Sequence, residues 1–203
     1  MPLGTSTILE HLLRGMARSG ISEATISLGY LGHLVRAVIG DGAGVGVNAE
    51  YTTESSPLGT AGPLRLLSHL DDDDIVLVVN GDTWTDFDFA SAVRALDERN
   101  ADAILVCTER TTRIDFGVVQ LDASDSLAQY VEKPTMTHLV STGINAIRGS
   151  TILNWLPEGR VDMPDFLQAV QSAGGTVSCL QTDASWRDLG RPDDLIAANE
   201  EYA

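Results

Sequence analysis

Two aspartates occupy positions where their carboxylates could share a divalent cation. Asp82 follows the apolar run 75–79 through the dipeptide Asn80-Gly81. An acidic residue just beyond the carboxyl end of a buried strand lies in the crevice where open α/β sheets bind ligands. Asp188 could supply a second carboxylate, and such oxygens suit a hard cation such as Mg²⁺. The alternative is that Asp82 accepts backbone hydrogen bonds in a turn and that Asp188 belongs to a plain loop.

A glycine-rich loop spans residues 54–62, with the sequence Glu-Ser-Ser-Pro-Leu-Gly-Thr-Ala-Gly. Its glycines let the backbone approach a ligand closely, and Thr60 can cap the helix expected next, turning amide donors toward a site. Read alone, the same stretch is an ordinary strand-to-helix loop.

The triplet Glu132-Lys133-Pro134 places an acid and a base at the end of an expected strand. The pair could hold a sugar hydroxyl and a phosphate respectively, with proline fixing the backbone. Surface Glu-Lys pairs are also common, and they contribute little on their own.

The charge balance restricts the possible partners of the 203-residue chain. It has 13 basic against 29 acidic residues and a net charge of −16. Nucleic acids and anionic membrane surfaces require a basic face, so the composition argues against both. A small anionic substrate fits only where a divalent metal or a few local cations reverse the field. The run 71–74 of four aspartates is expected to be a solvated turn.

The chain is expected to be cytoplasmic. No apolar run approaches the length of a transmembrane helix, and the first residues lack a secretory signal pattern. Cys107 and Cys179 both lie in apolar runs and are expected to be small buried residues. A disulfide between them stays open, although nothing indicates an oxidising compartment.

The elements that must position these residues alternate between helix and strand. Thr7 and Glu10 form a capping box for a helix over 8–19, and Asp88 can cap another over 89–100. The expected strands cover residues 24–28, 45–49, 75–79, 103–108, 117–121, 128–132, 140–147 and 176–181. Further helices are expected over residues 34–39, 63–70, 165–173 and 193–202. This order predicts one layered α/β domain with a mixed sheet.

In this order, the motifs resemble the sugar-1-phosphate nucleotidyltransferase family, the nucleoside-diphosphate-sugar pyrophosphorylases. The likeness spans essentially the whole chain, and its motifs are P-L-G-T-A-G, N-G-D, F-G-V-V at 116–119, E-K-P, the pair Gly143-Ile144 and W-x-D-x-G-x-P-x-D. It implies a Rossmann-like mixed sheet of the nucleotide-diphospho-sugar transferase type. The single domain 1–203 would have a nucleotide side over about 1–110 and a sugar side over about 111–203.

The resemblance also implies roles for individual residues. Asp82 and Asp188 would bind Mg²⁺ and, with Lys133, would be the catalytic residues. The implied nucleotide-binding residues are Glu54, Leu58, Gly59, Thr60 and Gly81, and the implied sugar-phosphate residues are Gly117, Glu132, Lys133, Thr142 and Gly143. The partners would be a nucleoside triphosphate and a sugar 1-phosphate, which react to an NDP-sugar and pyrophosphate. Positioning and charge neutralisation dominate such a transfer.

Within the family, the P-L-G-T-A-G loop looks most like that of guanylyltransferases acting on mannose or heptose phosphates. The stretch 80–89 looks equally like uridylyltransferases, and thymidylyl transfer stays open.

Two further classes of protein remain as alternatives to a nucleotidyltransferase. One is a non-catalytic NDP-sugar-binding or regulatory relative. The other is a glycosyltransferase of related architecture, which is less favoured because those enzymes use D-x-D, whereas Thr83 and Trp84 follow Asp82.

One family feature does not occur in the sequence. Family members open with a strand and the loop G-x-G-T-R, followed by a lysine, which together grip the triphosphate. Without that strand, its two neighbours would expose unpaired edges, and such edges attract another strand. We therefore expect either a biological start about twenty or more residues earlier, or pairing with another chain, as in a homo-oligomer.

Overall fold

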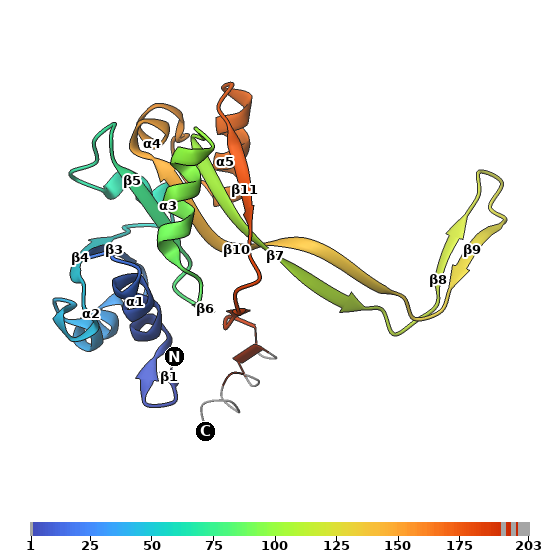
Figure 1. The fold of residues 1–203 in the computed structure, drawn as a ribbon, viewed down its shortest axis with the longest axis horizontal. Helices are drawn as coiled ribbons and strands as arrows, with labels where there is room; N and C mark the ends of the chain where they lie inside the picture. Colours follow the sequence, from blue (N-terminus) through green and yellow to red (C-terminus); the bar gives the residue numbers. More distant parts are fainter. Residues whose placement is uncertain (1, 192–193, 196–197, 199–203) are drawn as a thin grey trace.

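A four-stranded mixed sheet forms the centre of the molecule in the computed structural model, which describes residues 2–191, 194–195 and 198 (Figure 1). Its strand order is β11-β7-β10-β5. The strands are β5 (Ile75–Val79), β7 (Ala103–Arg113), β10 (Thr135–Arg148) and β11 (Val177–Gln181). β11 runs parallel to β7, and β10 runs antiparallel to both of its neighbours. Of the two strands in this sheet that come after residue 111, β10 lies inside it, between β7 and β5, and β11 lies at its edge.

A second sheet contains only β3 (Glu23–Leu28) and β4 (Asn48–Thr53), which pair in parallel. In the described part of the chain no strand joins this pair to β5, so both β3 and β5 have one edge without a strand partner. The sequence pattern predicted no strand before the helix that starts at residue 8, and this is wrong. A small hairpin of β1 (Pro2–Leu3) and β2 (Ser6–Thr7) precedes the first helix and joins neither larger sheet.

Two helices cover one face of the sheets. α1 (Ile8–Arg18) begins with the predicted capping box: Thr7 Oγ1 accepts from Glu10 N at 3.3 Å, and Glu10 Oε2 accepts from Thr7 N at 2.7 Å. The Thr7 amide and hydroxyl both donate to the Glu10 carboxylate, and these two bonds lower the pKa of Glu10. α3 (Phe89–Glu98) begins at its predicted cap, Asp88, whose side chain accepts from Ala90 N at 3.2 Å. Both helices bury their apolar faces in one core, which includes Leu12, Leu13, Phe89, Leu96, Ile104 and Ile144.

The opposite face of the four-stranded sheet is covered by α4 (Gly149–Trp155), α5 (Met163–Ser172) and the 3-10 turn η2 (Gly62–Leu66). Phe166 and Val170 of α5 are fully buried there against Ile147 of β10. The predicted helix 63–70 is therefore wrong in type and length. The last predicted helix, 193–202, falls mainly outside the described residues.

The remaining helical segments are α2 (Gly32–Ile39) and the 3-10 turn η1 (Ala43–Val45). The predicted strand 45–49 is wrong in its first half, because Gly42 and Gly46 adopt left-handed conformations that close η1. Pairing with β3 begins only at Asn48. No helix in the described residues is long and apolar enough to cross a membrane.

A two-stranded arm projects from the sheet (Figure 1). It comprises residues 109–139, where β7 and β10 continue beyond the sheet and pair from Glu109↔Leu139 to Arg113↔Thr135. Beyond them β8 (Val118–Leu121) and β9 (Leu127–Val131) form a hairpin. The predicted paired strands therefore exist, but β8 and β9 pair only with each other.

The two cysteines are free thiols and differ in environment. Cys107 is buried as predicted, whereas Cys179 is exposed, so that half of the prediction is wrong. Both lie on the neighbouring strands β7 and β11. Burial, with the nearby Cys179 thiol, raises the pKa of Cys107 to about 11.

Candidate functional site

The structure brings the two predicted metal-binding aspartates together around Gly190. β6 (Thr83–Thr85) pairs antiparallel with β12 (Trp186–Asp188), so that Asp188 faces Thr83. Leu189 N donates to the backbone oxygen of Asp82 at 3.0 Å. A Cβ atom placed on Gly190 would lie 2.7 Å from Asp82 Oδ2 and 3.1 Å from Asp188 Oδ1. Both carboxylates therefore border the space that the missing side chain of Gly190 leaves open.

This pair of carboxylates suits a magnesium ion. Mg²⁺ is usually bound by one or two carboxylates, and it takes its other ligands from water and substrate phosphates. The described residues contain no cluster of three or more His, Cys, Asp or Glu side chains that could hold a metal. Two carboxylates alone are fewer ligands than Mg²⁺ takes, so water and substrate phosphates would have to supply the others.

A β-bulge in β10 supports the loop that carries Asp82. The register with β7 shifts between Ser141 and Asn145. Within the bulge, the oxygen of Gly143 accepts from Asn80 N at 3.1 Å, and the oxygen of Thr142 accepts from Trp186 Nε1 at 2.8 Å. Gly143 has φ +75°, and a Cβ atom there would lie 2.6 Å from Asn80 Nδ2. The bulge thus fixes both segments that present the carboxylates.

Thr142 is almost fully buried, and its hydroxyl donates to the backbone oxygen of Val106 at 2.9 Å. The predicted role of Thr142 and Gly143 near a sugar stays a prediction. In the structure, Thr142 and Gly143 support the loop that carries Asp82.

The loop of residues 54–62 is held by hydrogen bonds to two other parts of the chain. Glu54 Oε1 accepts from the Ser27 hydroxyl at 2.9 Å, and Oε2 accepts from Leu58 N at 2.8 Å. The oxygen of Leu58 accepts from Val161 N at 2.8 Å. Gly59 has φ +83°, and a Cβ atom there would overlap the oxygen of Val161. The glycine is thus needed for close packing against residues 161–162.

Thr60 caps a different helix from the one expected. Its hydroxyl accepts from Met163 N, the first residue of α5, at 2.7 Å, and its own N donates to Asp162 Oδ1 at 3.1 Å. The turn η2 that follows the loop has no side-chain cap. The expectation that Thr60 caps the next helix is therefore wrong, because the loop folds onto α5, about 100 residues later.

The predicted sugar-phosphate residues of the arm lie away from the carboxylates. Gly117 precedes β8, while Glu132 and Lys133 follow β9, all in the projecting arm (Figure 1). A Cβ atom on Gly117 would collide with the ring of Tyr130, whose hydroxyl donates to Glu132 Oε2 at 3.0 Å. Lys133 is exposed and has φ +45°, which is uncommon for a residue with a side chain. Within one copy of the chain these residues do not join Asp82 and Asp188.

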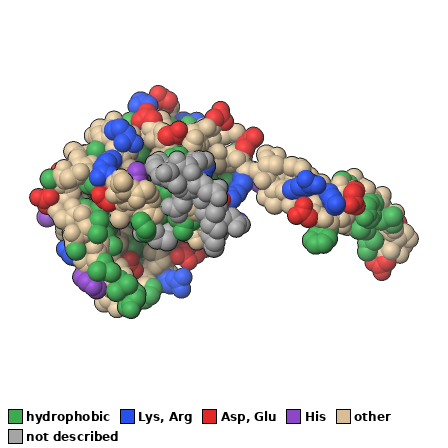
Figure 2. Space-filling view, turned by 90° about the horizontal axis from the view of Figure 1, so that it is seen from below, with side chains coloured by type: hydrophobic (Ala, Val, Ile, Leu, Met, Phe, Trp, Pro, Cys, Tyr) green, Lys and Arg blue, Asp and Glu red, His purple; other side chains and the backbone are tan. Residues whose placement is uncertain are grey.

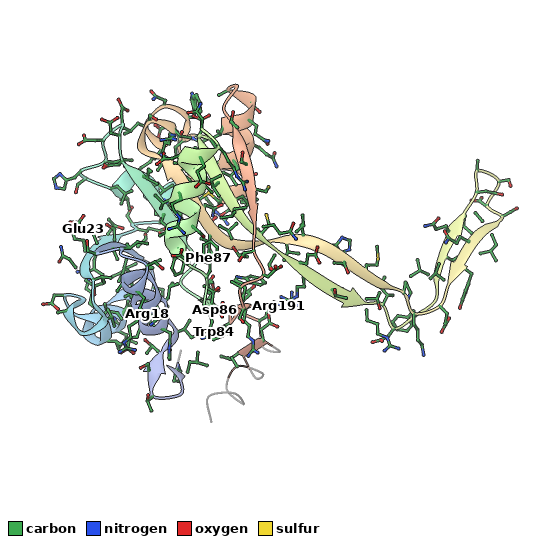
Figure 3. The ribbon with its side chains drawn as sticks, in the orientation of Figure 1. Arg18, Glu23, Trp84, Asp86, Phe87 and Arg191 are labelled. Carbon is green, nitrogen blue, oxygen red and sulfur yellow. The ribbon has the colours of Figure 1, made fainter. Side chains whose placement is uncertain are left out.

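The segment after Asp82 faces α1 across a small cavity. The cavity has a volume of about 160 Å³ and is lined by His11, Leu12, Arg18, Trp84, Thr85 and Asp86. Figure 3 labels Arg18, Trp84 and Asp86 in this region, with Phe87 next in the chain. None of the predicted nucleotide or sugar-phosphate residues lines this cavity.

Four residues that shape the site had no predicted role of their own. They are Asn80, Asp162, Trp186 and Gly190. Trp186 and Gly190 belong to the W-x-D-x-G motif and could have been proposed from it, whereas nothing local links Asp162 to the loop of residues 54–62.

Comparison with known proteins gives a consistent set of relatives. A model of the family described as "Nucleotidyl transferase" matches residues 1–203. The mannose-1-phosphate guanylyltransferase of Mycobacterium tuberculosis is 29% identical over 202 residues, covering 97% of this chain and 56% of that protein. The mannose-1-phosphate guanylyltransferase catalytic subunit beta of Dictyostelium discoideum is 26% identical over 193 residues, covering 92% and 53%. The chain thus spans about half the length of these curated relatives.

The fold has counterparts among solved structures. The crystal structure of HddC from Yersinia pseudotuberculosis superposes with a TM-score of 0.78, covering 100% of this chain and 88% of that one at 20% identity. The mixed α/β fold predicted from the sequence is confirmed by this likeness.

Proposed function

The chain belongs to the nucleotidyl transferase family, and from this premise we propose that it transfers a nucleotidyl group to a sugar 1-phosphate. An oxygen of the sugar phosphate attacks the α-phosphorus of a nucleoside triphosphate. The bond from that phosphorus to the β-phosphate oxygen breaks, so an NDP-sugar and pyrophosphate result. The observation that carries the proposal is the pair of carboxylates bordering Gly190.

We favour GTP as the donor and a mannose-type 1-phosphate as the acceptor. The support for this choice is the P-L-G-T-A-G loop at 57–62, together with two relatives that are named mannose-1-phosphate guanylyltransferases.

Each part of the site has a distinct task in the proposed reaction. Asp82 and Asp188 would hold Mg²⁺, which supplies charge neutralisation on the phosphates when bound. The loop of residues 54–62 would orient the nucleotide, and its anchoring to Ser27 and α5 limits the freedom lost on binding. The bulge at Thr142 and Gly143 keeps both carboxylate segments in place.

We expect Gly190→Ala to weaken metal binding without unfolding the protein. The added methyl group would enter the space between the two carboxylates, 2.7 Å from Asp82 Oδ2. Substitutions of residues that surround and orient metal ligands typically lower metal affinity by about 10–100-fold. Titration of Mn²⁺ followed by electron paramagnetic resonance measures this without any assay of activity. Gly44→Ala is the matched control, since its Cβ would meet open space. Equal Mn²⁺ affinity in both variants would contradict the assignment.

The proposed function is tested by pyrophosphate release from the purified chain. GTP, UTP and dTTP are each incubated with mannose 1-phosphate, glucose 1-phosphate and Mg²⁺, and the NDP-sugar is identified by mass spectrometry. We expect the highest kcat/KM for GTP with mannose 1-phosphate. A preference for UTP or dTTP would remove the choice of base, and no NDP-sugar from any pair would reject transferase activity for this chain.

A further inference from the structure

Asp162 immediately precedes α5, but its side chain does not cap this helix. An aspartate at such a position usually accepts a hydrogen bond from an amide of the first helical turn. In α5 the side chain of Asp162 accepts none, and the hydroxyl of Thr60 accepts from Met163 N instead, at 2.7 Å. The carboxylate of Asp162 is directed to the loop of residues 54–62, where its Oδ1 accepts from Thr60 N at 3.1 Å. The side chain of Asp162 therefore serves the loop rather than its own helix.

The hydrogen bond from Thr60 N to Asp162 fixes the peptide group between Gly59 and Thr60. This peptide group is trans and planar, so its N–H and its C=O point in opposite directions. Because the N–H is directed at Asp162, the oxygen of Gly59 is directed away from it. The same geometry recurs one residue later, where Ala61 N donates to the oxygen of Val161 at 3.0 Å. Two successive carbonyl groups of the loop thus point away from residues 161–162.

Without Asp162, the peptide group between Gly59 and Thr60 would be free to rotate. Gly59 has φ +83°, and a glycine adopts positive and negative φ about equally readily. Rotation would therefore exchange the directions of the N–H and of the Gly59 oxygen at little steric cost. Hydrogen bonds to a charged acceptor are stronger than those between neutral groups. The other oxygen of Asp162, Oδ2, lies 3.7 Å from Arg160 Nη2, so neighbours direct both oxygens.

The adjacent contacts of the loop are made by backbone atoms and do not depend on the side chain at position 162. Val161 N donates to the oxygen of Leu58 at 2.8 Å. The oxygen of Val161 accepts from Ala61 N and Gly62 N at 3.0 and 3.1 Å. Substitution of Asp162 should thus release one peptide group without detaching the loop.

We propose that Asp162 is a positioning residue for nucleotide binding. It holds the peptide group between Gly59 and Thr60 in the orientation that receives the nucleoside triphosphate. This role rests on the proposed function, in which Gly59 and Thr60 bind the nucleotide. Asp162 acts through the loop, so its loss weakens nucleotide binding and leaves the chemical step largely unchanged.

Steady-state kinetics of three variants separates positioning from helix capping. Asp162→Ala should raise the KM for the preferred nucleoside triphosphate, expected to be GTP, about tenfold, with kcat changed by less than about twofold. Asp162→Asn keeps an acceptor oxygen in place and should restore most of the affinity. Serine caps helices well but is too short to replace the carboxylate, so Asp162→Ser should behave like Asp162→Ala. A serine variant with the KM of the unmodified protein would assign Asp162 to helix capping and overturn the proposal.

Asp165→Ala is the matched control for the change in charge. Asp165 is an exposed residue in the first turn of α5, and its replacement removes the same charge from the same end of the helix. Figure 2 shows acidic side chains distributed over the molecule rather than gathered at one point. The KM of this variant should equal that of the unmodified protein. An equal rise in both alanine variants would trace the effect to charge and contradict positioning.

Hydrogen exchange tests the local part of the proposal without any substrate. In ¹⁵N-labelled protein followed by nuclear magnetic resonance, the Thr60 amide should exchange at least about tenfold faster in Asp162→Ala. The amides of Ala61 and Gly62 should change little, because their acceptor is the backbone oxygen of Val161.

The two measurements separate this proposal from the proposed function. Unchanged exchange at Thr60, or faster exchange with an unchanged KM, would overturn the role of Asp162 even if the chain proves to be an active transferase. An unmodified chain without transferase activity would reject the proposed function and, with it, the role of Asp162 in nucleotide binding.

Discussion

Replacing Asp82 or Asp188 by asparagine should lower the rate of pyrophosphate release by about a hundred- to a thousandfold. Each substitution keeps the size of the side chain and removes one of the two negative charges bordering Gly190. The loss of a single electrostatic contact to the transition state typically costs about 2.7–4 kcal/mol. Steady-state kinetics over a range of Mg²⁺ concentrations measures the effect, and the variants should also need more Mg²⁺ for their residual activity.

Asp73→Asn is the matched control for these variants. Asp73 is exposed in the acidic run 71–74, so the substitution changes the net charge equally without touching the site. Its rate should equal that of the unmodified protein. If the Asp82 and Asp188 variants retain full activity as well, the carboxylates do not hold the metal and the site lies elsewhere.

Gly59→Ala should lower the free energy of unfolding by about 2–5 kcal/mol. The left-handed conformation of Gly59, φ +83°, is unfavourable for alanine, which accounts for about 1–2 kcal/mol. The new methyl group would also overlap the oxygen of Val161 and lie 2.7 Å from Asp162 Oδ1. Relieving such overlap typically costs about 1–3 kcal/mol more. Urea unfolding followed by circular dichroism measures the sum.

Gly20→Ala separates the two contributions. Gly20 has φ +85°, almost the same as Gly59, but a Cβ atom there would have nothing within 4 Å. Its cost should therefore be only the conformational part, about 1–2 kcal/mol. Equal losses for the two variants would show that the loop relaxes away from Val161 and that its packing on residues 161–162 contributes little.

Features set by neighbouring residues could be predicted from the sequence. The capping box of Thr7 and Glu10 and the cap at Asp88 form as expected, because each depends on residues at most three positions apart. The apolar run 75–79 is a strand of the four-stranded sheet. The family resemblance implied that Asp82 and Asp188 share one ion, and the pairing of β6 with β12 brings these two residues close together.

Features that depend on distant partners could not be predicted in this way. Alternation in 117–121 and 128–132 is the same whether the strands join a sheet or project from it, so the arm was not foreseen. Thr60 has the composition of a local cap, but its partner is Met163. The sugar-side roles of Gly117, Glu132 and Lys133 stay predictions, since one copy does not bring them to the carboxylates.

The separation of β3 and β4 from the larger sheet has a mechanical consequence. In the described residues this pair meets the rest of the body through side chains such as Ala24 and Ile26, which pack on the core shared with α1 and α3. Side-chain packing permits small sliding displacements, known as shear, that a continuous ladder of backbone hydrogen bonds would resist. Glu54 follows β4 directly, whereas Thr60 is fastened to α5. Sliding of the pair would therefore act on the hydrogen bond from Leu58 N to the Glu54 carboxylate, which joins the part of the loop next to β4 to the part fastened on residues 161–163.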